Sequence, residues 1–119
     1  MTKVRQAVGE HGERLAERHL AEQGLVVLSR NWRCCDGEID LVLRDGHDVV
    51  FCEVKTRRNT RFGTPAEAIR LDKVRRLRRL ASRWLAESSL RPRELRFDVV
   101  EVLLRPPDPP VIEHTRAAF

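Results

Sequence analysis

The sequence predicts one α/β domain with a central mixed β-sheet of about four or five strands and at least two flanking helices. Its 119 residues suffice for a single hydrophobic core and are too few for two domains. Two stretches have the apolar spacing of helices, and short runs of β-branched and other apolar residues separate and follow them. We therefore expect the strands and helices to pack as layers of one domain.

A first helix is predicted over residues 2–23, with Gly24 as its C-terminal stop. Its apolar positions recur at helical spacing: Val8, Leu15, Ala16 and Leu20. Glu13 lies three and seven positions before two of these residues and therefore shares their face, so it either points inward or pairs with a neighbouring arginine at the surface. A short first strand is predicted over residues 25–28, and residues 29–33 are expected to lead into the next strand.

Residues 37–55 predict a β-hairpin that carries three carboxylates and one lysine on one face. Apolar residues fill both strands around Asp45-Gly46, a pair typical of hairpin turns. With this pair at the turn, Asp40 faces Phe51. Alternation along the strands then places four polar side chains on one face of the sheet: Glu38, Asp40, Glu53 and Lys55. A four-residue loop keeps this arrangement, whereas a three-residue loop without a bulge puts the acids on opposite faces.

Asp40 and Glu53 are diagonal neighbours in this register, about 7–8 Å apart at the backbone. Carboxylates this close resist joint ionisation unless a positive charge lies between them, and Mg²⁺ or Mn²⁺ would supply that charge. Lys55 is then placed to orient or deprotonate an attacking water, or to hold a phosphate oxygen. Glu38 is expected to support these residues from behind. The alternative interpretation is a half-exposed hairpin whose Glu and Lys side chains are solvated or paired with each other.

A polar, basic loop is predicted over residues 56–63, followed by a helix that begins at Thr64 or at Asp72. The apolar positions that face the sheet are Val74, Leu77, Ala81 and Trp84. The other sides of the helix carry six cations: Lys73, Arg75, Arg76, Arg78, Arg79 and Arg83. Such a helix can neutralise several phosphates of a nucleic-acid backbone, or it can be a solubilising surface.

The C-terminal part predicts a strand over residues 95–104, a turn over residues 106–110 and a last short strand that contains His114. Asp98 lies on the opposite face of its strand from Phe97, and pairing with an arginine is the favoured interpretation. A structural role is likewise favoured for His114. Cys52 is expected to be a small buried residue, and the adjacent pair Cys34-Cys35 predicts neither a disulfide framework nor a zinc site.

The formal net charge of +5, with 23 Lys and Arg residues, favours a polyanionic partner such as nucleic acid. Six aromatic residues and no tyrosine argue against recognition by stacked single-stranded bases. No apolar run approaches the roughly 18–20 residues that span a bilayer, and the N-terminus has no apolar signal-peptide core. We therefore expect a cytoplasmic protein that contacts nucleic-acid backbones and no membrane.

Asp40, Glu53, Val54 and Lys55 resemble the PD-(D/E)xK motif of the restriction-endonuclease-like superfamily, in which an Asp and a Glu-x-Lys on adjacent strands bind metal and cut phosphodiesters. The wider pattern resembles the YraN family of small bacterial proteins. The motifs that carry this resemblance run along nearly the whole chain: Gly12-Glu13, Arg30-Asn31, Arg33, GEIDLV, FCEVKTR, Gly63, Pro65, Ala68-Ile69, Lys73, RFDVV, IEH and the terminal AAF.

The resemblance implies a restriction-endonuclease-like fold, similar to that of archaeal Holliday-junction resolvases. The hairpin residues and the resemblance together favour a Mg²⁺- or Mn²⁺-dependent endonuclease that acts on DNA. The similarity to resolvases further implies a branched or structured substrate, a homodimer, and Glu13 as a third metal ligand beside Asp40 and Glu53. Nucleic-acid contacts are expected from Arg33, Arg57, Arg58, Lys73, Arg76 and Arg79. A non-catalytic nucleic-acid-binding module, RNA as the substrate, and a scaffold that meets acidic proteins remain open alternatives.

Overall fold

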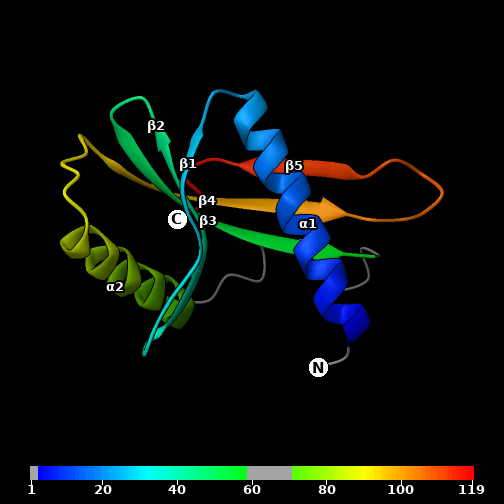
Figure 1. Cartoon of the computed structure of the whole chain (residues 1–119), viewed down its shortest axis with the longest axis horizontal. Coiled ribbons are helices and arrows are strands. Elements are labelled where there is room, and N and C mark those ends of the chain that lie inside the picture. The colour runs from blue at the N-terminus through cyan, green and yellow to red at the C-terminus, as the bar shows by residue number, and fades with distance from the viewer. Residues whose placement is uncertain (1–2, 59–70) are drawn as a thin grey trace.

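A computed structural model describes residues 3–58 and 71–119 and confirms the predicted α/β class (Figure 1). One five-stranded mixed sheet lies between two helices. The elements in chain order are α1 (Lys3–Glu22), β1 (Val26–Cys34), β2 (Gly37–Asp45), β3 (Asp48–Arg57), α2 (Leu71–Glu87), β4 (Leu95–Leu103) and β5 (Val111–Thr115). No helix among the described residues is both long and apolar enough to cross a membrane.

The strand order in the sheet is the chain order, β1-β2-β3-β4-β5. Strands β3 and β4 are parallel, and the other neighbouring pairs are antiparallel. Parallel neighbours need a long crossover connection, and the segment that contains α2 provides it. This topology puts β3, which carries Glu53 and Lys55, in the centre of the sheet, directly before the crossover segment that contains α2.

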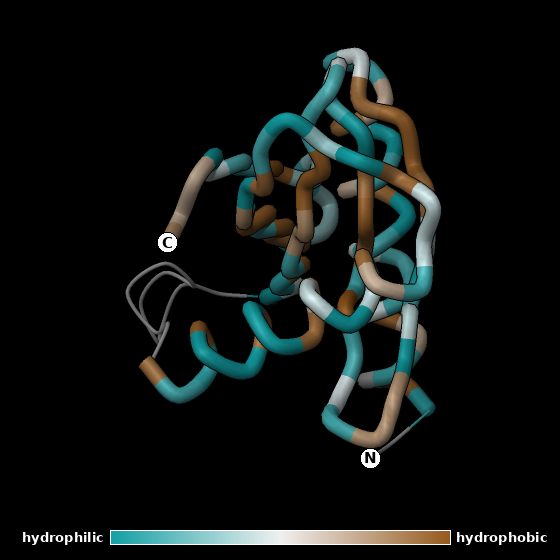
Figure 2. Tube along the Cα trace, turned by 90° about the vertical axis from the view of Figure 1, so that its left-hand side faces the viewer, coloured by the Kyte–Doolittle hydropathy of each residue, from teal (hydrophilic) through white to brown (hydrophobic). Residues whose placement is uncertain are grey.

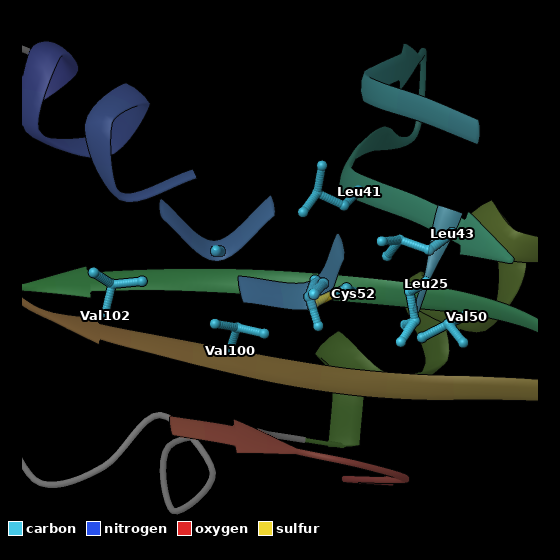
Figure 3. Packing of buried hydrophobic residues seen from close by; sticks show 9 residues of the cluster. Leu25, Leu41, Leu43, Val50, Cys52, Val100 and Val102 are labelled. Atoms are coloured by element: carbon cyan, nitrogen blue, oxygen red, sulfur yellow. The ribbon is translucent and has the colours of Figure 1, made fainter. Parts of the chain in front are cut away.

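Helix α1 covers one face of the sheet, where strands β2, β3 and β4 supply most of the core (Figure 3). The buried residues on this face are Ala16, Leu20, Leu25, Leu41, Leu43, Val50, Cys52, Val100 and Val102. The helix ends as predicted, because Gly24 has a left-handed backbone (φ 92°) and the N–H of Leu25 returns to the carbonyl of Leu20. Cys52 is the small buried residue that the sequence predicted.

Helix α2 covers the opposite face of the sheet and packs on a second core. The buried residues there are Ile39, Val42, Val49, Phe51, Leu80, Ala81, Trp84 and Phe97. Apart from this apolar stripe, α2 is mostly hydrophilic along its length, as Figure 2 shows for the helix that follows the grey trace. The predicted cationic sides of α2 are therefore exposed around a helix that is anchored by its apolar side.

The predicted register of the β2–β3 hairpin was wrong, although the predicted sharing of faces was correct. Asp45 pairs with Asp48, so the turn is Gly46-His47 and lies one residue later than expected. Gly46 takes the positive φ of 63° that the first position of a two-residue hairpin turn favours. The shift preserves alternation: paired Val42 and Phe51 both face α2.

Two strands are longer than the sequence predicted. Strand β1 continues to Cys34 because it pairs with β2 as far as Cys34↔Gly37, with a β-bulge between Val27 and Ser29. Strand β3 includes Thr56 and Arg57, which were expected in the basic loop and which pair with β4. The rest of that loop and a helix start at Thr64 lie outside the described residues, and the described part of α2 begins at Leu71.

A buried charge network joins β4, β5 and the C-terminal residues, and it confirms the predicted pairing of Asp98 with an arginine. Asp98 accepts two hydrogen bonds from Arg96, at 2.9 and 3.0 Å, and one from the backbone N–H of Ala117 at 3.0 Å. His114 Nε2 lies 2.7 Å from the same carboxylate, in the structural role that the sequence favoured. Phe119 stacks on Phe97 with ring centroids 5.6 Å apart, which holds the chain end against the sheet.

Candidate functional site

The site begins where the pairing of β2 with β3 ends. The last backbone pair is Leu41↔Cys52, so Asp40 and Glu53 are the next residues on the two strands. There the backbone N–H of Val54 donates to Asp40 Oδ2 at 2.8 Å. A partly buried N–H needs an acceptor, and the Asp40 carboxylate supplies it. The end of the strand pairing thus fixes the position of the first predicted catalytic residue.

Burial and neighbouring negative charge raise the pKa of Asp40 from 3.8 to about 6. Burial is the largest cause, the Val54 hydrogen bond opposes it, and the charges of Glu13, Glu53 and Glu38 raise the pKa further. The predicted repulsion between Asp40 and Glu53 is therefore present. A carboxyl with a pKa near neutrality, lining a recess, is typical of functional sites.

Glu53 meets two lysines from different elements of the fold. Lys55 Nζ of β3 lies 3.1 Å from Glu53 Oε1, and Lys73 Nζ of α2 contacts the same oxygen. Burial is the largest influence on both ammonium groups and lowers their pKa, while Glu53 raises it. Burial and the neighbouring Lys55 keep the pKa of Lys73 below its usual value, whereas Glu53 and the contact with Lys73 hold the pKa of Lys55 above its usual value. The positive charge that the sequence assigned to a metal ion is thus supplied in part by lysines.

The second carboxylate oxygen of Glu53 is unsatisfied. Glu53 Oε2 is buried and has no hydrogen-bond partner among the described residues. Buried polar atoms are nearly always paired, so an unpaired carboxylate oxygen marks a place for a ligand. Mg²⁺ and Mn²⁺ prefer such oxygens and are commonly bound through one or two carboxylates, with waters and substrate phosphates completing the shell. Asp40 and Glu53 fit this donor set.

A recess of about 370 Å³ on the α2 side of the sheet contains both carboxylates. Its lining residues are Gly37, Glu38, Asp40, Cys52, Glu53, Lys73, Arg76, Leu77 and Leu80. The acidic residues come from β2 and β3, and the two cations come from the first turns of α2. The basic helix therefore borders the carboxylates, which favours a phosphate-binding surface over a merely solubilising one.

Glu13 lies on the other side of the sheet, on α1, and lines a larger recess of about 540 Å³ with Arg58 but without Asp40 or Glu53. Burial raises the pKa of Glu13, and a hydrogen bond with Asn31 opposes the rise. Within the described part of the chain, no three His, Cys, Asp or Glu side chains are grouped closely enough to hold a metal ion. The role of Glu13 as a third ligand therefore stays a prediction.

The residues expected to contact nucleic acid do not all lie at the recess that contains Asp40. Lys73 and Arg76 line the recess with Asp40, and Arg79 is exposed on the same helix. The remaining three residues have other neighbours: Arg33 is paired at 2.8 Å with Glu38, Arg57 lies 3.9 Å from Glu101, and Arg58 lines the α1-side recess. Glu38, expected behind the catalytic residues, lies at the rim and lines the recess itself.

Sequence reasoning missed two features of the site. Lys73 was expected to meet phosphate, and the structure places it on Glu53. Gly12 lies inside the helical pattern, and a Cβ at this position would overlap the side chain of Thr56. A glycine inside a helical pattern is the signal that could have indicated this close approach of α1 to β3.

Comparisons with known proteins agree with the resemblance. The model of the uncharacterised protein family UPF0102 matches residues 12–102. A UPF0102 protein of Frankia alni is 58% identical over 118 residues, which cover 98% of each chain. UPF0102 proteins of Nocardia farcinica and a Nocardioides species are 52% and 53% identical, over 97% and 95% of this chain and 91% of each relative. The chain therefore belongs to the uncharacterised protein family UPF0102, which is the YraN family.

Proposed function

We propose that the protein is a metal-dependent endonuclease that hydrolyses phosphodiester bonds in DNA. The observation that carries the proposal is the recess in which Asp40 and Glu53, with its unsatisfied buried oxygen, lie beside Lys55 and Lys73. Metal-assisted phosphodiester hydrolysis needs carboxylates that hold the cation and a group that orients the water. Two acidic residues and a lysine supply these groups where the pairing of β2 with β3 ends. A bound Mg²⁺ or Mn²⁺ would stabilise the negative charge that builds up on the scissile phosphate.

Each side chain has a distinct part in this proposal. Asp40 and Glu53 hold the cation through their carboxylate oxygens. Lys55 Nζ, at the rim of the carboxylate pair, orients the attacking water or holds a phosphate oxygen. Arg76 on the α2 wall of the recess contacts a phosphate of the same strand, and a guanidinium can do so through two hydrogen bonds.

A duplex backbone fits this surface better than single-stranded bases do. Phe51, Phe97 and Trp84 are buried in the α2-side core, so these rings do not stack on bases. The exposed arginines of α2 instead present charge along the helix, which suits phosphates. The similarity to resolvases supports branched or structured DNA and a homodimer as further parts of the proposal, which keeps the expected cytoplasmic location.

One observation favours a second candidate, a nucleic-acid-binding module without catalysis. Lys55 and Lys73 already neutralise Glu53 in the absence of any cation. A recess that is balanced by its own lysines can bind phosphates through α2 and never cut them. RNA as the substrate is the other alternative, because backbone contacts alone distinguish the two polymers poorly.

Cleavage of labelled linear duplex, four-way junction and structured RNA, with Mg²⁺ or Mn²⁺, tests the proposal. Wild type is compared with Glu53→Ala, Lys55→Ala and the exposed control Glu94→Ala. We expect cutting of a DNA substrate by wild type and by Glu94→Ala, and loss of cutting in the two site variants and with a chelator. A wild type that binds these substrates and cuts none with either metal contradicts the nuclease and supports the module.

A further inference from the structure

Glu53 is satisfied on one oxygen and unsatisfied on the other. Lys55 and Lys73 both contact Oε1, while the buried Oε2 has no partner among the described residues. A single carboxylate oxygen does not need two ammonium groups, and both lysines are only partly exposed, with 39% and 29% of their side chains accessible. The crowding of positive charge on Oε1 therefore needs an explanation beyond surface pairing.

The charges at the site balance only while a cation is absent. Two carboxylates, Asp40 and Glu53, face two ammonium groups, Lys55 and Lys73. A divalent cation held by both carboxylates would add two positive charges next to the lysines, and like charges a few ångströms apart repel strongly in a partly buried site. At least one ammonium then has to leave Glu53.

Of the two lysines, Lys73 has the clearer way out. Lys55 follows Glu53 by two positions on the central strand β3, which pairs with β4 at this point. Lys73 reaches across from the first turn of α2, and its side chain lines the open recess next to Arg76. A lysine stem is flexible, so the ammonium can swing into the recess while the helix stays in place.

We propose that Lys73 is the resident counter-ion of Glu53, that a divalent cation displaces it, and that the released ammonium then contacts the substrate phosphate. The inference rests on the proposed metal-dependent function and adds a regulated residue to it. In the cation-free protein, Lys73 neutralises the buried carboxylate of Glu53. When the cation binds, it releases the Lys73 ammonium, which is then free to bind phosphate. Lys73 thereby competes with the cation and assists the substrate.

Ammonium NMR of the whole chain tests the displacement directly, because the sequence contains three lysines, Lys3, Lys55 and Lys73. Mg²⁺ is titrated without DNA. We expect the Lys73 ammonium signal to move toward that of the exposed Lys3 as Mg²⁺ saturates. A Lys73 signal that stays unchanged at saturating Mg²⁺ overturns the displacement.

Calorimetric titration with Mn²⁺ gives an independent measurement on Lys73→Met, Lys73→Arg and the matched control Arg75→Met, which removes one exposed cation from the same helix. Lys73→Met should bind Mn²⁺ about three- to tenfold more tightly than wild type, since the competing ammonium is gone. Lys73→Arg should stay closer to wild type, and Arg75→Met should lie within about twofold of it. An unchanged or weaker affinity of Lys73→Met contradicts the inference.

Asp40→Asn separates failure of the inference from failure of the proposed function. If wild type binds Mn²⁺, Asp40→Asn does not, and Lys73→Met matches wild type, the cation site stands and the counter-ion role of Lys73 is wrong. If wild type binds no Mn²⁺ in the titration, both the metal-dependent function and the role of Lys73 are wrong.

Discussion

The backbone N–H of Val54 donates a 2.8 Å hydrogen bond to Asp40 Oδ2, so a side chain serves as the acceptor where the pairing of β2 and β3 ends. This bond holds the Asp40 carboxyl in a buried position beside Glu53. The same placement raises the pKa of Asp40 to about 6, since burial and neighbouring acids outweigh the hydrogen bond. The buried placement of Asp40 at the end of the strand pairing therefore accounts both for its position beside Glu53 and for its raised pKa.

Asp40→Asn should stabilise the protein near neutral pH. The folded pKa of about 6 exceeds the ordinary 3.8, so ionised Asp40 destabilises the folded state above pH 6, and the penalty fades between pH 6 and pH 4. Asparagine keeps an acceptor for Val54 and carries no charge. Urea unfolding at pH 7.5 should show a gain on the order of 1–3 kcal/mol, and at pH 4 the two proteins should be nearly equal. A gain that does not depend on pH would contradict this cause.

Asp98→Asn should destabilise the protein at neutral pH. Burial alone would raise the pKa of Asp98, but hydrogen bonds from Arg96, Ala117 and His114 together lower it, so its ionised form stabilises the fold above its ordinary pKa. Loss of this buried charge should lower the free energy of unfolding by about 2–4 kcal/mol. Urea unfolding measures the change, with exposed Asp108→Asn as a control that should change stability by less than about 0.5 kcal/mol. If both substitutions changed the free energy of unfolding equally, the buried charge network around Asp98 would not stabilise the fold.

Alternation along the strands was enough to predict which residues share a face. Val42, Phe51 and Glu53 share one face as expected, and α2 covers it, although the turn lies one residue later than predicted. The error in the turn left the faces intact because it shifted the pairing by an even number of residues. The turn position depends on the backbone of Gly46, whose positive φ favours the first position of the turn. Composition alone did not distinguish a Gly46-His47 turn from an Asp45-Gly46 turn.

The parts of the site that the sequence did not predict depend on how the helices dock. The contact of Lys73 with Glu53 joins residues from α2 and β3, and no local pattern specifies where the first turn of α2 will lie. Glu13, expected as a metal ligand with Asp40, forms a hydrogen bond with Asn31 that the sequence did not predict, and its charge raises the pKa of Asp40. Periodicity identified the inward faces of both helices, and tertiary packing decided which polar neighbours they meet.

Gly9→Ala and Gly12→Ala form a matched pair within α1. Both substitutions favour the helix by about 1 kcal/mol on propensity alone. A Cβ at Gly9 meets nothing within 4 Å, whereas one at Gly12 would overlap Thr56. Thermal unfolding should therefore give Gly9→Ala a stability equal to or above that of wild type. Gly12→Ala should lower the free energy of unfolding by about 1–3 kcal/mol, because α1 must shift away from β3. Stabilisation by Gly12→Ala would mean that this close approach does not exist in solution.

The role of α2 in binding nucleic acid can be measured through salt dependence, independently of cleavage. If Arg76 and Arg79 each neutralise one phosphate, removing either should weaken binding of duplex DNA and reduce the slope of log affinity against log salt by about 0.9. The exposed Arg91, in the segment between α2 and β4, lies off the helix and provides a control with the same loss of charge. Fluorescence anisotropy at several salt concentrations, in chelator, gives the slopes. Because the substitutions change net charge equally, an Arg91→Ala slope as low as that of Arg76→Ala would show that overall charge, and not the α2 surface, governs binding.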